Sequence, residues 1–225
     1  MTTRTTSFKT DAEIQDDVLD ELQWDGRVQP TEVGVSVKEG IVTLSGHVDN
    51  YTKLWAAEEA ALRVRGVKAV ANELEVRLPN MAERPDEELA QAVTWALTWA
   101  ADVPTGHMHV VVSKGWVTLT GEVDRLVQRD AAYRAVRHLA GVRGVDNLLT
   151  VRQPTPVPAD VKQRIERALV RNAALDAKGI RVEIQERTVL LWGVVRSHAE
   201  RRAAADSAVS APGIAAVENH LRIEE

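Results

Sequence analysis

The residues that could carry chemistry in this chain are few and scattered. It holds 6 histidines and no cysteine, which excludes disulfides, cysteine-ligated metals and thiol catalysis. His107 and His109 lie two residues apart, as a metal pair on one strand face would, but no third ligand follows nearby, so we expect a surface pair without metal. The sequence contains no phosphate loop, nucleophile elbow or zinc-protease motif. We therefore expect a protein that is not an enzyme and has no cofactor.

The charge balance and the hydropathy of the chain limit the kinds of partner that it can bind. The 225 residues carry 33 acidic against 28 basic side chains, and this balance argues against a dedicated nucleic-acid-binding protein. No apolar run reaches the roughly 18 residues that a membrane helix needs, so we expect no transmembrane segment. Residues 1–10 are polar and unlike a secretory signal, so we expect a flexible tail and a cytoplasmic chain, periplasmic only if a leader once preceded it.

The chain repeats one module three times. Residues 11–77, shifted by 75, fall on 86–152, and these, shifted by 72, fall on 158–224 without gaps. Identical residues then share columns, among them Val42/Val117/Val189, Leu44/Leu119/Leu191, Gly46/Gly121/Gly193, Ala56/Ala131/Ala203, Gly66/Gly141/Gly213 and Asn72/Asn147/Asn219. Proline-containing linkers separate the copies. We therefore expect modules at 11–78, 86–152 and 158–225, with function residing where exposed columns differ.

Each copy predicts the same order of elements. In the first copy, Ile14, Val18 and Leu22 recur every four residues, which indicates a helix with one apolar face. Two stretches of period-two alternation predict strands, an alanine-rich stretch predicts a second helix, and a third alternation ends the module. The fold class is therefore α+β: three tandem αββαβ modules, each with two helices on one face of a three-stranded mixed sheet. We expect the Gly46 column to mark a bulge or a close helix approach, and the Asn72 column to tie down the turn before it.

These columns resemble the BON domain (bacterial OsmY and nodulation). The resemblance rests on the V-x-L-x-G-x-V strand, the alanine-rich helix, the glycine turn and V-x-N-x-L-x-V, and it covers about 200 residues in three copies. It implies an αββαβ fold without catalysis and a role in binding phospholipid surfaces or protein partners, often under osmotic or envelope stress. One cytoplasmic relative that carries a second domain binds potassium, so the resemblance also makes potassium a possible ligand.

The tryptophans are where the copies differ most. Trp55 stands where the other copies have Asp130 and Arg202, so we expect it to form an exposed apolar patch with Leu54 and Leu62. Trp95 replaces Asp20 and Arg167, and with Trp99 it predicts an aromatic ridge on the second module. Trp24 and Trp99 end their helices beside the apolar stripe, and we expect both to pack partly.

Two further surfaces distinguish the third module. Leu190, Trp192 and Val194 make its outer sheet face apolar, so we expect another module, a second subunit or a ligand to cover them. Its first helix carries Arg164, Arg167 and Arg171 where the first module has Asp17, Asp20 and Trp24. The other arginines of this predicted anionic-surface contact are Arg201 and Arg202.

The sequence thus favours a non-enzymatic BON-repeat protein that binds or assembles, related to stress or osmotic response. Protein partners or self-association are expected, and an anionic phospholipid surface is possible because clustered arginines attract such headgroups. The arginine flank could equally meet the aspartate flank, within one chain or between chains. The alternative is a cytoplasmic sensor of a small ligand or potassium.

Overall fold

The computed structural model describes residues 9–28, 32–80, 82–152, 160–172, 175 and 177–224. The expected tail at residues 1–8 and the second linker, 153–158, lie outside these residues. Thr10 belongs to the first module, because its side chain and that of Glu13 form a reciprocal capping box at the start of the first helix.

Three modules follow one another along the chain, each with the order helix, strand, strand, helix, strand. The first consists of α1 (Asp11–Trp24), β1 (Val33–Lys38), β2 (Ile41–Val48), α2 (Tyr51–Arg63) and β3 (Ala69–Val76). The second consists of α3 (Asp86–Trp99), β4 (Met108–Ser113), β5 (Trp116–Val123), α4 (Leu126–Val136) and β6 (Gly144–Val151). The third consists of α5 (Val161–Arg171), the short η2 (Ala177–Gly179), β7 (Ile180–Gln185), β8 (Thr188–Val195), α6 (His198–Val209) and β9 (Ala216–Ile223).

Each module has its own mixed sheet, in which the middle strand pairs antiparallel with the first strand and parallel with the third. The register repeats in all three copies, with Leu44 opposite Val35 and Asn72, and its equivalents placed likewise. The predicted α+β fold with three αββαβ modules is therefore confirmed.

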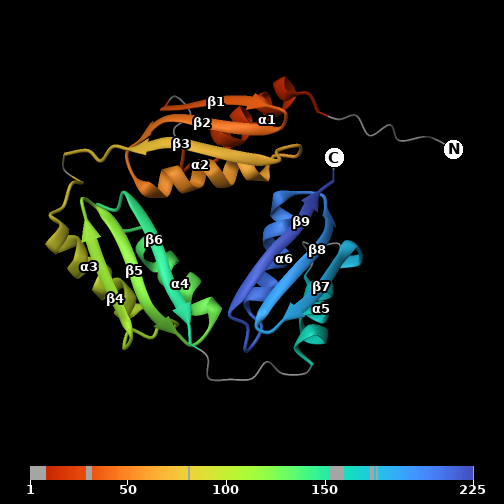
Figure 1. Cartoon of the computed structure of the whole chain (residues 1–225). Coiled ribbons are helices and arrows are strands. Elements are labelled where there is room, and N and C mark those ends of the chain that lie inside the picture. The colour runs from red at the N-terminus through yellow and green to blue at the C-terminus, as the bar shows by residue number, and fades with distance from the viewer. Residues whose placement is uncertain are drawn as a thin grey trace.

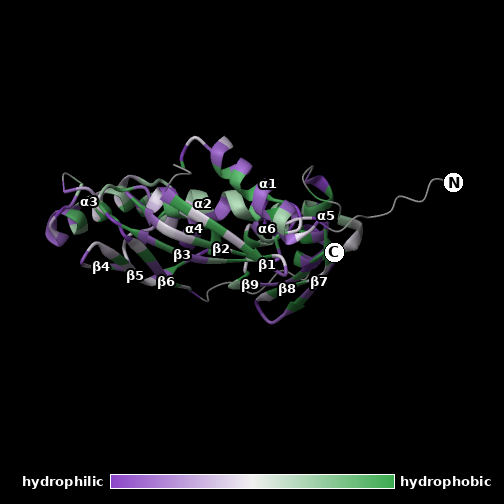
Figure 2. Ribbon diagram, turned by 90° about the horizontal axis from the view of Figure 1, so that it is seen from above, coloured by the Kyte–Doolittle hydropathy of each residue, from purple (hydrophilic) through white to green (hydrophobic). Residues whose placement is uncertain are grey.

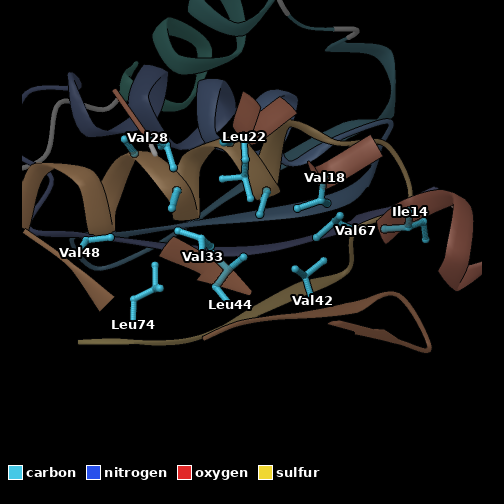
Figure 3. Close-up of a cluster of buried hydrophobic side chains, with 14 residues drawn as sticks. Ile14, Val18, Leu22, Val28, Val33, Val42, Leu44, Val48, Val67 and Leu74 are labelled. Carbon is cyan, nitrogen blue, oxygen red and sulfur yellow. The ribbon is translucent and has the colours of Figure 1, made fainter. Parts of the chain in front are cut away.

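The core of each module lies between its sheet and its two helices. Figure 3 shows Val18 and Leu22 of α1 pointing toward Val42 and Leu44 of the sheet, and all four are fully buried. The short alanines of α2 let that helix lie close to the strands. The same positions build separate cores in the second and third modules, so each module buries its own apolar stripe.

Glycine in the second strand is required by a close backbone contact. Gly121 has a φ of +116°, and a Cβ there would lie 2.0 Å from the carbonyl oxygen of His107. Gly46 and Gly193 repeat this geometry. The predicted close approach exists, but it comes from backbone just before the first strand and not from a helix.

The asparagine that the three copies share connects the third strand of each module to its second helix. Asn147 Nδ2 donates to the carbonyl oxygen of Arg129 at 2.7 Å, and Asn219 donates to that of Arg201 at 2.9 Å. Asn72 instead donates to the carboxylate of Glu58 at 3.0 Å. The expectation that these amides hold the preceding turn was wrong, because their side chains point toward the helix that packs on the strand.

The three modules form a ring. In Figure 1 they occupy the corners of a triangle, and the second helix and last strand of each module are turned toward the middle. Figure 2 shows the helices on one side of this ring and the sheets on the other. The second helices, α2, α4 and α6, therefore decide how the modules meet, whereas α1, α3 and α5 lie farther from the centre.

Candidate binding surfaces

Exposed aromatic side chains mark the first helices of the first two modules. Trp24 and Trp99 are each 87% exposed, and Trp95 is 67% exposed. The predicted ridge of Trp95 and Trp99 on α3 is therefore present, but the expectation that Trp24 and Trp99 pack partly was wrong. Each stands two residues after the last buried leucine of its helix, about 200° around the wheel, which turns it away from the core.

The first helix of the third module presents arginines instead. Arg164, Arg167 and Arg171 are exposed on α5, and within the described residues none of them has a carboxylate partner. Val170 lies beside them and is 73% exposed. The first helix of the third module thus carries exposed basic side chains where the first module has acidic ones.

The outer sheet face of the third module is less bare than its sequence predicts. Leu190 is only 7% exposed, and the Trp192 ring stacks on His220 with centroids 4.1 Å apart. Val194 remains 45% exposed. The chain itself thus already covers part of this face.

A second apolar sheet face lies on the second module. Trp116, Val111 and Leu148 are 47%, 57% and 60% exposed on the outer faces of β5, β4 and β6. Trp116 donates its indole N–H to the carboxylate of Asp146 at 2.8 Å, which fixes the ring over Gly144. Sequence analysis missed these residues, although the alternation of β4 and β6 already assigns Val111 and Leu148 to the side opposite the core.

Trp55 lies between modules and not on an outer surface. The guanidinium carbon of Arg137, from the second module, is 3.6 Å from the centroid of the Trp55 ring. Arg27 of the first module and Arg202 of the third module both stand 5.6 Å from the same centroid. Such arginine–indole contacts stabilise by roughly 0.5–2 kcal/mol each, depending on desolvation.

The carboxylate of Glu59 supports this three-way contact. It forms an ion pair with Arg202, and its second oxygen is 3.6 Å from Arg27. Arg27 is also held by Asp25, and this guanidinium keeps the pKa of the Asp25 carboxyl well below its usual range. Two acidic side chains thus hold the arginines of two modules beside one tryptophan.

In the contacts between modules, the first residue of a second helix meets the neighbouring module. At the start of α2, the Tyr51 hydroxyl lies 3.0 Å from that of Tyr133 on α4, and Tyr51 packs against the core of the second module. Its equivalent at the start of α6, His198, lies with Nε2 3.1 Å from the carbonyl oxygen of Lys68 in the first module. Leu126 starts α4 in the same way and is only 2% exposed. The first residues of α2 and α6 therefore each lie against a neighbouring module.

This head-to-tail contact occurs at two junctions, from the first module to the second and from the third module to the first. A heterologous contact of this kind forms a ring when its rotation returns to the start. Burial raises the pKa of Tyr51, and its hydrogen bond to Tyr133 acts in the same direction. Burial lowers the pKa of His198 and of His138, which lies 3.3 Å from Thr52 across the junction of the first two modules.

The remaining predicted residues belong to these junctions or to the core. Leu54 packs partly against the core of its own module, because it lies one helical turn before the buried Ala57 and two turns before the buried Ala61. Leu62, Arg201 and Arg202 line a cavity between α2 and α6. The predicted patch of Leu54, Trp55 and Leu62 therefore does not exist as one outer surface.

Metal-binding groups do not gather in the described part of the chain. No group of three or more histidine, aspartate or glutamate side chains within it could hold a metal ion. His107 and His109 are both exposed. None of the described helices has the length and hydropathy needed to cross a bilayer.

The repeated αββαβ unit and its three aligned copies define a protein built of tandem domains. The profile of the BON domain matches residues 10–77, 85–153 and 159–225, so the chain belongs to the BON family. Over 145 residues it is 28% identical to the osmotically-inducible protein Y of Escherichia coli (strain K12), an alignment that covers 63% of this chain and 72% of that protein.

Solved structures give weaker similarities. The C-terminal domain of CdsD, a structural protein of the type III secretion system of Chlamydia trachomatis, is 15% identical to this chain, with a TM-score of 0.27 and coverage of 96% of this chain and all of that one. A second structure of CdsD is 17% identical with a TM-score of 0.26, covering 93% of this chain and 91% of the other. Similarities this low support no conclusion about function.

Proposed function

We propose that this chain is a non-enzymatic binding protein of the osmotic-stress response that docks on an anionic phospholipid surface. The first helices α1, α3 and α5 form the contact, with Trp24, Trp95 and Trp99 entering the headgroup region and the arginines of α5 meeting the phosphates. The observation that carries the proposal is the exposure of three tryptophans on helices at one side of the ring, together with the unpaired Arg164, Arg167 and Arg171 on that same side.

The chemistry of both groups suits a membrane interface. Indole rings prefer the boundary between water and hydrocarbon, where one edge is apolar and the ring N–H stays hydrated. Each arginine near an anionic leaflet contributes about 1 kcal/mol, so three of them together raise the affinity roughly a hundredfold at low salt. Similarity to the osmotically-inducible protein Y supports the stress-related role.

Liposome flotation tests this proposal. The full chain should float with vesicles that contain phosphatidylglycerol and stay behind with pure phosphatidylcholine, and flotation should weaken as salt screens the arginines. Trp95→Ala and Arg167→Gln should each reduce flotation, whereas Trp55→Phe, at the module junction, should leave it unchanged. Absence of flotation at low salt, or equal flotation of all variants, would overturn the proposal.

Self-association is the second candidate, favoured by charge. Residues 11–77 hold 14 acids against 7 bases, and residues 158–225 hold 10 acids against 11 bases. The aspartate flank of α1 in one molecule could therefore meet the arginine flank of α5 in another, head to tail. Light scattering at low salt should then show concentration-dependent oligomers that Arg164→Glu combined with Arg167→Glu abolishes; a monomer at every concentration excludes this candidate.

A further inference from the structure

The junction between the third and first modules forms an open cavity of about 480 Å³. Helix α2 contributes Leu62 and Arg63 to its lining, and α6 contributes Ala199, Arg201, Arg202 and Ala203. The volume lies within the range of small-molecule sites, which run from about 300 to 1,000 Å³. The cavity is bounded by two helices with intact backbone hydrogen bonding, so its walls are rigid elements.

Comparison with the sister junction explains why space remains here. Between the first and second modules, the Trp55 ring fills the corresponding place and Arg137 lies flat on it. The repeat alignment puts Arg202 at the position of Trp55 and Leu62 at the position of Arg137. The junction between the third and first modules therefore lacks the indole–guanidinium pair, and the side chains at these two positions are smaller or point elsewhere.

The arginines that line the cavity differ in whether a carboxylate pairs with them. Arg63 is held by Glu21 and Asp25, at 2.7 and 2.9 Å, and Arg202 is held by Glu59. Arg201 donates one guanidinium N–H to the carbonyl oxygen of Asn219 at 3.1 Å. Within the described residues it has no carboxylate partner, so the remaining donors of its guanidinium are available in the cavity.

The acidic side chains of the lining do not compete for Arg201. Glu59 is already shared by Arg27 and Arg202. Asp206 is exposed at the rim, and it acts on Asp130 of the second module, whose pKa is raised chiefly by burial and further by this neighbouring charge. The cavity therefore combines an apolar wall of Leu62, Ala199 and Ala203 with one available guanidinium.

We propose that this cavity binds a small aromatic monocarboxylate. Its ring takes the place that Trp55 occupies in the sister junction, against Leu62 and Ala203, and its carboxylate receives two parallel N–H hydrogen bonds from Arg201. Because the ligand contacts both α2 and α6, it fastens the third module to the first. Binding would thus favour the closed ring over any form in which this junction has separated.

Ligand-observed NMR and thermal unfolding of the full chain test this site with benzoate as the probe. Benzoate should bind and raise the melting temperature, whereas benzyl alcohol, which lacks the charge, and acetate, which lacks the ring, should bind at least about tenfold more weakly, a difference of ~1.4 kcal/mol. Arg201→Gln should weaken benzoate binding by a similar factor while keeping a donor for the carbonyl of Asn219.

Two further variants keep the result interpretable. Ala203→Leu fills the cavity and should reduce binding, with circular dichroism confirming that the variant is folded. Arg77→Gln removes an exposed arginine that lies outside the cavity, and this variant should bind benzoate as the unchanged chain does. No binding at about 10 mM benzoate, equal binding of benzyl alcohol, or undiminished binding to folded Arg201→Gln would each overturn the proposal. Flotation with vesicles does not enter this test, so the two proposals fail independently.

Discussion

One column of the repeat shows how equivalent residues acquire different tasks. Trp55, Asp130 and Arg202 occupy the same position in their second helices, and all three point to where the modules meet. The tryptophan accepts the guanidinium of Arg137 on its face, and Arg202 pairs with Glu59 beside it. Divergence at this position has thus produced contacts between copies, because an identical residue in all three could not supply both a cation and its partner.

Trp55→Ala should destabilise the protein by roughly 1–3 kcal/mol, since it removes a half-buried ring and leaves Arg137 without its aromatic contact. Trp99→Ala is the matched control, because Trp99 is 87% exposed, and it should change stability by no more than about 0.5 kcal/mol. Urea unfolding followed by circular dichroism measures both. Equal effects of the two substitutions would contradict the assignment of Trp55 to the junction.

Gly121→Ala should cost about 1–3 kcal/mol or more, because a Cβ would collide with the carbonyl of His107 and the residue has a φ of +116°. Gly106→Ala serves as control, since nothing lies within 4 Å of a Cβ there. Thermal unfolding of both variants decides the matter. A small effect at Gly121 would show that the strand can shift away from this contact.

At the scale of elements, the two helices of each module have separate roles. The first helix buries one stripe against the sheet and leaves its other faces to solvent, which is why Trp24, Trp95 and Arg167 are exposed. The second helix buries alanines against the strands and presents its opposite side to the neighbouring module. Exposed tryptophan and arginine side chains therefore accumulate on first helices, and side chains that contact a neighbouring module accumulate on second helices.

We expect the two junction histidines to make the ring less stable in acid. Burial lowers the pKa of His138 and His198 below the ordinary value of 6.5, so the closed ring favours their neutral forms. The unfolded or open chain takes up protons first as the pH falls below about 6.5, and stability therefore decreases there, while it is fully retained above that pH.

Melting temperatures at pH 7.5 and pH 5.5 measure this loss. His198→Gln keeps a donor near the carbonyl of Lys68 but does not titrate, so the drop in melting temperature between the two pH values should be smaller than in the unchanged chain. His109→Gln, at an exposed position, should show the same drop as the unchanged chain. A drop that is identical in all three proteins would exclude a role for His198.

At the scale of the whole molecule, closure of the ring ties the three modules into one body. A module of about 67 residues buries only a modest core and is marginal alone, so contacts with its neighbours add to its stability. The junctions are mostly polar and aromatic, and they are small compared with the module cores. They are therefore the part of the molecule that should respond first to ligands, pH or substitution.

Arg202→Glu should open the junction between the first and third modules. It replaces the partner of Glu59 by a second carboxylate, and like charges at ion-pair distance repel. Small-angle X-ray scattering should then report a larger maximum dimension than in the unchanged chain, with the individual modules still folded by circular dichroism. Arg164→Glu on the free face of α5 should leave the dimension unchanged; an unaltered scattering curve for Arg202→Glu would contradict the closed ring.

The sequence by itself determined the module. Columns such as Val42/Val117/Val189 and Gly46/Gly121/Gly193 recur because every copy must build the same sheet and the same close contact, and this local physics is written into side-chain spacing. It also located the exposed ridge of Trp95 and Trp99, since a residue replaced by charge in other copies faces away from its own core.

Only the tertiary structure decided what each outward-facing tryptophan contacts. Trp55 and Trp95 look alike in the sequence, as each replaces charged residues on the outer side of a helix. One meets arginines from all three modules and the other meets solvent. Helical periodicity specifies the direction of a side chain within its own module, but contacts between modules depend on how three rigid bodies fit together, and no short-range pattern encodes that fit.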